Sequence, residues 1–120
     1  MKHNFRELLI WQDSIKNATL TYQISRKFPK EEMFGITSQM RRAAVSIASN
    51  IAEGSGRGTD SQFIHFLDIA LGSSFELETQ ILIIKELGYI ENEILETWIL
   101  NLQSIHKRII AFRNKLSATT

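Results

Sequence analysis

Histidines, acidic residues and cysteines are the side chains that could bind a metal ion or carry catalysis, and their spacing decides between these uses. The chain has three histidines and no cysteine. Di-iron sites in helical bundles need inward Glu-x-x-His pairs, but Gln62 precedes His65 and Gln103 precedes His106 at that spacing. The lack of cysteine excludes a thiolate zinc site, a cysteine nucleophile and a disulfide scaffold. The sequence therefore predicts no metal, no cofactor and no catalytic residue, and we expect a protein that is not an enzyme.

Two rows of polar side chains are the strongest sign of a specific contact. Each row repeats at the spacing of a single helix face. The rows are Gln39, Arg42, Ser46, Asn50 and Glu53, and Ser73, Glu76 and Gln80. We interpret them as a polar network between helices or between subunits, with Arg42 and Glu76 as an ion pair. The alternative is a ligand-binding or catalytic cleft built on Glu53 or Glu76, which would need a deep pocket.

A glycine-rich stretch, GSGRGT at residues 54–59, precedes a predicted helix and could cradle a phosphate at that helix's N-terminus. The stretch lacks the Walker lysine, the dinucleotide-binding spacing and a preceding strand. Asp60 in the first turn of the helix also disfavours an anion. We interpret the stretch as a flexible turn between two helices.

Four long segments with helical periodicity would position these side chains. In the first, Trp11, Ile15, Ala18 and Tyr22 recur at i, i+4, i+7 and i+11, which is the apolar stripe of an amphipathic helix. The other three segments repeat the same pattern. The predicted helices are 7–28, 35–55, 60–87 and 92–116.

Proline and glycine separate the predicted helices. Pro29 ends the first, because it disfavours helical backbone in the preceding residue and lacks an N–H. Gly54 is expected to adopt the left-handed conformation that ends the second helix, and Gly88 to end the third. Thr59 is the predicted N-cap of the third helix, with Gln62 as its capping-box partner.

The chain has 120 residues, 43% hydrophobic and 22% charged, which is typical of one globular domain spanning 1–120. Short connections between long helices predict an all-α, up-down-up-down antiparallel four-helix bundle. No apolar run approaches the ~18 residues of a membrane span. The N-terminus does not resemble a signal peptide. We expect a cytoplasmic protein that makes no membrane contact.

The distribution of charge is more informative than the formal net charge of +1. In an antiparallel bundle both termini and the 54–59 turn lie at one end, where basic residues would gather, Lys2 and Arg6 among them. Five others are candidate phosphate contacts: Arg57, Lys107, Arg108, Arg113 and Lys115. These charges are explained equally well without a ligand, because basic residues near a helix C-terminus interact favourably with the helix dipole and are solvated at the surface. Oligomerisation would favour the phosphate interpretation, because it repeats the basic end and accumulates contacts.

The helix predicted over 60–87 has more apolar surface than one stripe. Ile64, Ile69, Phe75, Leu82 and Ile83 lie outside its main stripe, and their apolar surface also needs a covering contact. A helix that is apolar on several sides is central in its fold or faces a partner subunit. The segment therefore predicts a partner subunit or another protein as a binding partner.

The sequence resembles a known family over nearly its whole length. The most specific stretch is residues 28–54, FPKEEMFGITSQMRRAAVSIASNIAEG, and further matches are Leu8, Trp11-Gln12, Ile69-Ala70, Gly72-Ser73, Glu76-Leu77 and residues 87–90. These residues look like the signature of the four-helix-bundle family named for the 23S rRNA intervening sequence. The resemblance implies a bundle that assembles as a homopentameric ring and offers no catalytic residues. The family is also similar to the accessory variability protein of diversity-generating retroelements, a basic ring that binds nucleic acid.

Two functions follow as expectations. The first is a non-enzymatic homo-oligomer, a pentamer by resemblance, that binds RNA or DNA through its basic end. The second is a protein-interaction scaffold or adaptor with no nucleic-acid activity. Light scattering tests the assembly that both require, and binding of generic RNA at varied salt distinguishes between them.

Overall fold

The computed structural model describes residues 3–119, and every regular element within that range is helical. Four α-helices make up most of it: α1 (Leu9–Ser25), α2 (Ile36–Ser55), α3 (Asp60–Leu87) and α4 (Asn92–Thr119). Two short 3₁₀-helices, η1 (Phe5–Glu7) and η2 (Lys30–Glu32), precede α1 and α2. The predicted all-α fold with four helices is confirmed.

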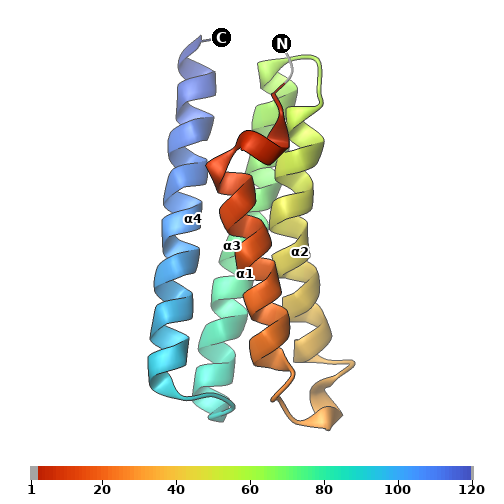
Figure 1. Ribbon diagram of the computed structural model, residues 1–120, viewed down its shortest axis with the longest axis vertical. Helices are drawn as coiled ribbons and strands as arrows, with labels where there is room; N and C mark the ends of the chain where they lie inside the picture. The colour runs from red at the N-terminus through yellow and green to blue at the C-terminus, as the bar shows by residue number, and fades with distance from the viewer. Residues whose placement is uncertain (1–2, 120) are drawn as a thin grey trace.

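The four helices run alternately up and down in a rod that measures 46 × 24 × 20 Å (Figure 1). Each helix packs against its neighbours in sequence, and α1 also packs against α4, which closes the bundle. Both ends of the chain and the connection between α2 and α3 lie at one end of the rod, and the other two connections lie at the opposite end (Figure 1).

Two predicted helices match the structure within one residue, and two differ. The first helix was expected over 7–28 but begins at Leu9, because Leu8 is extended, with φ −77° and ψ 123°. It ends at Ser25, because the next N–H groups, those of Lys27 and Phe28, bond to carbonyls only three residues back. The fourth helix continues to Thr119 instead of ending at 116, since nothing after Leu116 breaks it.

A single hydrophobic cluster joins all four helices, with Ile10, Ile47, Leu77 and Ile109 as members from α1 to α4. Trp98 is the largest of the fully buried side chains. Burial of such side chains is worth about 1.5–3 kcal/mol each and is the main force that holds the helices together. The apolar stripes predicted for α2, α3 and α4 supply most of this core. The stripe predicted for α1 is wrong, because Ile15 and Tyr22 are exposed and the helix instead turns Ile10, Ser14, Asn17, Thr21 and Ile24 inward.

The expected role of Gly54 is wrong. Among the described residues only Gly88 has a positive φ, 71°, and it caps α3 as predicted. Gly54 instead lies buried inside α2, which continues to Ser55. A Cβ atom at Gly54 would stand 2.7 Å from Phe63 Cδ1 and 2.8 Å from Phe66 Cβ. Gly54 is therefore required because a side chain there would collide with α3, and not for a turn.

Most of the apolar surplus of α3 remains on the surface of the single chain. Ile69, Phe75, Leu82 and Ile83 are exposed. None of the described helices is both long enough and apolar enough to cross a membrane.

Candidate functional site

The five predicted phosphate contacts all lie in the half of the bundle that holds the chain ends. Arg57 is in the connection between α2 and α3, and the other four lie in the second half of α4 (Figure 1). Lys2, also expected there, is outside the described residues. The structure therefore places Arg57, Arg113 and Lys115 toward that end of the rod and Lys107 and Arg108 near the middle of α4. Their side chains also differ in what they contact.

Three of the five are held in ion pairs within the chain. Arg108 pairs with Asp13 of α1, and Arg113 makes two hydrogen bonds to Asp68 of α3, at 2.5 and 3.3 Å. The bonds to Asp68 raise the pKa of Arg113. Arg57 lies 3.3 Å from Glu53 and over the ring of Phe66. These arginines connect structural elements, which the sequence did not indicate.

Lys107 and Lys115 are exposed and form no ion pair with other described residues. A third exposed lysine is Lys16 of α1. It lines a cavity of about 260 Å³ between α1 and α4 together with Arg108. Arg108 and Lys115 are seven residues apart, which places them on the same face of α4. We call these four residues, Lys16, Lys107, Arg108 and Lys115, the basic seam.

The cavity under the basic seam is polar at its mouth and holds a buried amide. Asn101 and Ser104 of α4 line it, and Leu20 and Ile105 supply apolar walls. Asn17 of α1 also lines it, with only 4% of its surface exposed. Neither its Nδ2 nor its Oδ1 atom has a hydrogen-bond partner among the described residues. The seam between α1 and α4 therefore carries polar groups that the chain itself does not satisfy.

The polar rows of α2 and α3 are brought together only in part. The Ser46 and Ser73 hydroxyls lie 2.8 Å apart, and the Asn50 Nδ2 group donates to the Ser46 carbonyl and hydroxyl at 2.9 and 3.0 Å. Arg42 and Glu76 are exposed and form no ion pair with each other. Gln39 is also exposed, Glu53 pairs with Arg57, and Gln80 is buried with an unpartnered Oε1. Ser46, Asn50 and Ser73 thus bridge α2 and α3, whereas Gln39, Arg42, Glu53 and Glu76 face outward.

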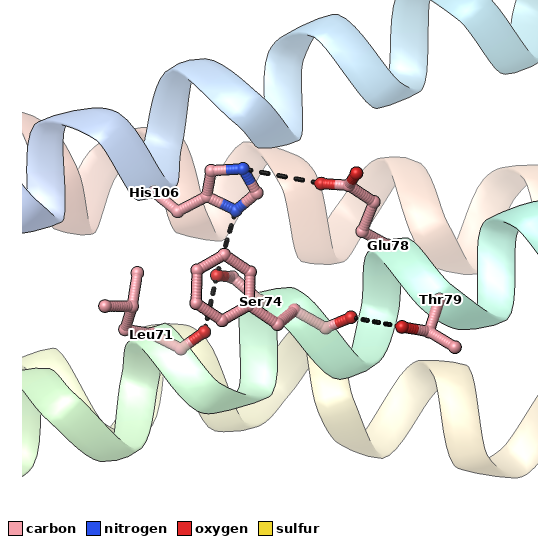
Figure 2. A network of polar contacts seen from close by, with 6 residues as sticks. Leu71, Ser74, Glu78, Thr79 and His106 are labelled. Carbon is pink, nitrogen blue, oxygen red and sulfur yellow. Dashed lines mark hydrogen bonds and ion pairs between the residues drawn. The ribbon is translucent and has the colours of Figure 1, made fainter.

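A buried polar network on α3 and α4 was missed by sequence reasoning (Figure 2). His106 places Nδ1 3.1 Å from the Ser74 hydroxyl and Nε2 3.4 Å from Glu78. The Ser74 hydroxyl also lies 2.7 Å from the Leu71 carbonyl. The neutral ring satisfies both neighbours only when Nε2 carries the proton. Because Ser74 is fully buried, a substrate cannot reach this serine, and we assign the network to holding α3 against α4.

Burial lowers the pKa of His106, and this effect outweighs the attraction of Glu78, which raises it. The unfolded chain takes up this proton near pH 6.5 and the folded chain only at lower pH. Stability from His106 is therefore fully present above about pH 6.5 and is lost as the pH falls through the folded pKa. We expect the free energy of unfolding, measured in urea, to fall from pH 7.5 to pH 5, and less steeply in His106→Gln.

Two further variants test this assignment. Glu78→Gln removes the attraction that supports the charged ring, so its stability should depend on pH more steeply than the wild type. His65→Gln, at an exposed position on α3, should keep the wild-type dependence. The same slope in His106→Gln as in the wild type would show that other groups cause the pH dependence.

The structure offers no support for a catalytic cleft at Glu53 or Glu76. Both carboxylates are exposed, and neither lines the cavity between α1 and α4. Among the described residues no group of three or more histidine, cysteine, aspartate or glutamate side chains could hold a metal ion.

Comparisons with known proteins agree with this architecture. A family model described as 23S rRNA-intervening sequence protein matches residues 6–111. A solved structure from Bacteroides thetaiotaomicron VPI-5482, a protein of unknown function from the S23 ribosomal protein family, is similar with a TM-score of 0.82. The two share 24% sequence identity, and the match covers 88% of this chain and 98% of that chain. At this identity the likeness shows the fold alone. The comparison with curated proteins gives no match.

Proposed function

We propose, from the premise that this chain belongs to the family of 23S rRNA-intervening sequence proteins, that it is a non-enzymatic homo-oligomer that binds RNA or DNA. The basic seam is the proposed contact. The observation that carries the proposal is the position of Lys16 at a cavity between α1 and α4 that Asn101 and Ser104 line, beside the ion pair of Arg108 with Asp13. Amide and hydroxyl groups beside cations are the donors that proteins use to bind phosphate oxygens.

The proposed contact reads the nucleic-acid backbone and not its sequence. Lysines on flexible stems neutralise phosphates as point charges and displace bound counterions, which makes such binding depend strongly on salt. Arg57, Arg108 and Arg113 are the weaker candidates, since Glu53, Asp13 and Asp68 already neutralise them. Lys107 and Lys115, with no such carboxylate, are the stronger ones.

Assembly strengthens this proposal. One subunit offers few phosphate contacts, and a ring would repeat the basic seam once per subunit, so that the contacts accumulate. The pentamer implied by the family resemblance would have five times the subunit mass of 13.8 kDa, which light scattering measures directly. A cytoplasmic location is part of the proposal, because a chain without cysteine suits a reducing compartment.

Neutralisation of the seam lysines should weaken binding of RNA. We expect Lys16→Gln, Lys107→Gln and Lys115→Gln together to lower the affinity for a generic single-stranded RNA about tenfold or more at low salt. The slope of log K against log salt should fall by about one per removed phosphate contact. Fluorescence anisotropy over a salt series measures both quantities.

The opposite end of the bundle supplies a matched control. Arg26, Lys30 and Lys85 are exposed there, and replacing all three by glutamine makes the same change in net charge. This control should keep both the affinity and the salt slope. Equal losses in the two triple variants would show that only total charge matters, and no binding by the wild type at low salt would overturn the proposal.

The second candidate is a scaffold or adaptor that binds protein and no nucleic acid. The exposed apolar side chains of α3, among them Phe75, Leu82 and Ile83, favour it. An oligomer that fails to bind RNA at low salt would leave this candidate standing.

A further inference from the structure

Phe34 is the most exposed large apolar side chain of the described residues, at 98%. It lies in the connection between η2 and α2. That connection is tied down on its inner side, where the Tyr89 hydroxyl donates to Glu32 at 2.7 Å and the Gly35 N–H donates to the Glu32 carbonyl at 3.0 Å. Scattered apolar side chains on a surface are ordinary. An ordered connection that holds a phenyl ring wholly in water is a better candidate for a docking element.

A cavity of about 670 Å³ opens at the same end of the bundle. Leu20 and Ile24 of α1 form one wall, and Ile90 and Ile94 form the other. Lys27 and Glu91 also line this hollow, which we call the end cavity. It has room for many waters at ~30 Å³ each, so it can accept an aromatic side chain.

Phe34 does not reach the end cavity of its own chain. It borders a different hollow, together with Tyr22, Arg42 and Val45. Figure 1 shows the connection between α1 and α2 on the α2 side of the rod, and α4 on the opposite side. The hollow beside Phe34 lies between α1 and α2, and the end cavity lies between α1 and the start of α4, so the two are at the same end of the rod on either side of α1. If a second copy is displaced sideways without moving along the rod axis, the Phe34 ring of one copy meets the end cavity of the other.

Charges beside the two features are complementary. Arg42 borders the same hollow as Phe34, is exposed and forms no ion pair with a described residue. Glu91 lines the end cavity and is also exposed without an ion pair. Insertion of the ring would bring an unpaired guanidinium to an unpaired carboxylate. Electrostatic complementarity of this kind selects the partner and fixes its register.

We propose that Phe34 of one copy inserts into the end cavity of the next copy, in a head-to-tail contact. This inference rests on the proposed homo-oligomer and specifies the contact that builds it. Each added copy leaves one ring and one cavity free, so such contacts continue until the assembly closes. The Arg42 side chain of the first copy pairs with Glu91 of the second.

Two substitutions test the contact from its two sides. Phe34→Asp removes the ring, and Ile94→Arg blocks the end cavity at a partly exposed position that the fold tolerates. Each variant should dissociate, with a subunit dissociation constant at least about 30-fold higher than that of the wild type, as for an interface hot spot. Sedimentation over a concentration series measures this shift, and Leu9→Asp at an exposed position at the other end of the bundle is the matched control that should assemble normally.

A mixture of the two variants distinguishes head-to-tail from symmetric contacts. Phe34→Asp keeps its cavity and Ile94→Arg keeps its ring, so the mixture should form a heterodimer of one copy each and nothing larger. Two separately dissociated variants that fail to combine would overturn the proposal. Assembly of Phe34→Asp at the wild-type concentration would also overturn it, although the homo-oligomer itself would stand. A wild type that is monomeric at all concentrations would overturn both.

Covalent trapping gives a second measurement, because the chain has no cysteine of its own. Met33→Cys combined with Glu91→Cys should give a ladder of disulfide-linked subunits on oxidation. Either substitution alone should give none, since a head-to-tail contact never places a residue against its own copy. Linked dimers from a single substitution would show a symmetric contact and overturn the proposal.

Discussion

Replacing Gly54 by alanine should destabilise the bundle by about 2–3 kcal/mol, although alanine favours helix by about 1 kcal/mol relative to glycine. The added Cβ would stand 2.7 Å from Phe63 Cδ1 and 2.8 Å from Phe66 Cβ, closer than real carbon atoms approach. A phenyl ring can turn aside, but the Cβ of Phe66 moves only with the backbone of α3. The two helices must therefore separate along a contact that is otherwise fully packed.

Gly72 is the matched control for this prediction. It is exposed within α3, and a Cβ there would meet no atom within 4 Å. Gly72→Ala should therefore raise stability by about 0.5–1 kcal/mol through helix propensity alone. Urea denaturation of both variants gives the two free energies. A gain in stability from alanine at both positions would show that α2 and α3 can move apart near Gly54 at little cost in free energy.

The error over Gly54 shows what a single sequence can resolve. Periodicity predicted α2 and α3 nearly to the residue, because the apolar stripe and the caps are local features. A glycine near a helix end suits a left-handed cap and a close helix crossing equally well. The choice depends on which residue of α3 lies opposite, and here it is Phe66. That register is a property of two helices together.

The candidate site shows the same limit in its charges. The topology brings Arg57, Arg113 and Lys115 toward one end and leaves Lys107 and Arg108 near the middle of α4, and summing charges could not reveal which of these residues are neutralised. Arg108 pairs with a carboxylate 95 residues earlier in the chain, and Arg113 with one 45 residues earlier. Asp13 and Asp68 face these arginines only because α1 and α3 flank α4 in this register. Lys16 entered the site for the same reason.

Metal-ligand and catalytic spacings along the sequence do not reveal the network around His106. His106 and Ser74 are 32 residues apart and meet across two helices. The available signal was a polar residue at a core position: both His106 and Ser74 fall on the apolar stripes of their helices. Buried polar residues of this kind need partners, so two of them on neighbouring helices predict a contact.

Replacing Asn17 by leucine should stabilise the protein by about 1–3 kcal/mol. Folding removes its amide from water without giving either Nδ2 or Oδ1 a hydrogen-bond partner among the described residues. Leucine carries no polar atom and is the better helix former by a few tenths of a kcal/mol, about 0.4. The larger side chain has space, because Asn17 borders the cavity of about 260 Å³ between α1 and α4.

Asn101→Leu is the control, because it makes the same chemical change in the same cavity at an exposed position of α4. Asn101→Leu should change the free energy of unfolding only by about 0.4 kcal/mol, which is the difference in helix propensity between asparagine and leucine. A gain at Asn17 well above that at Asn101 assigns the cost to a buried, unpaired amide. A loss at Asn17 would mean that water in the cavity satisfies the amide, and that the seam between α1 and α4 is hydrated beneath its basic residues.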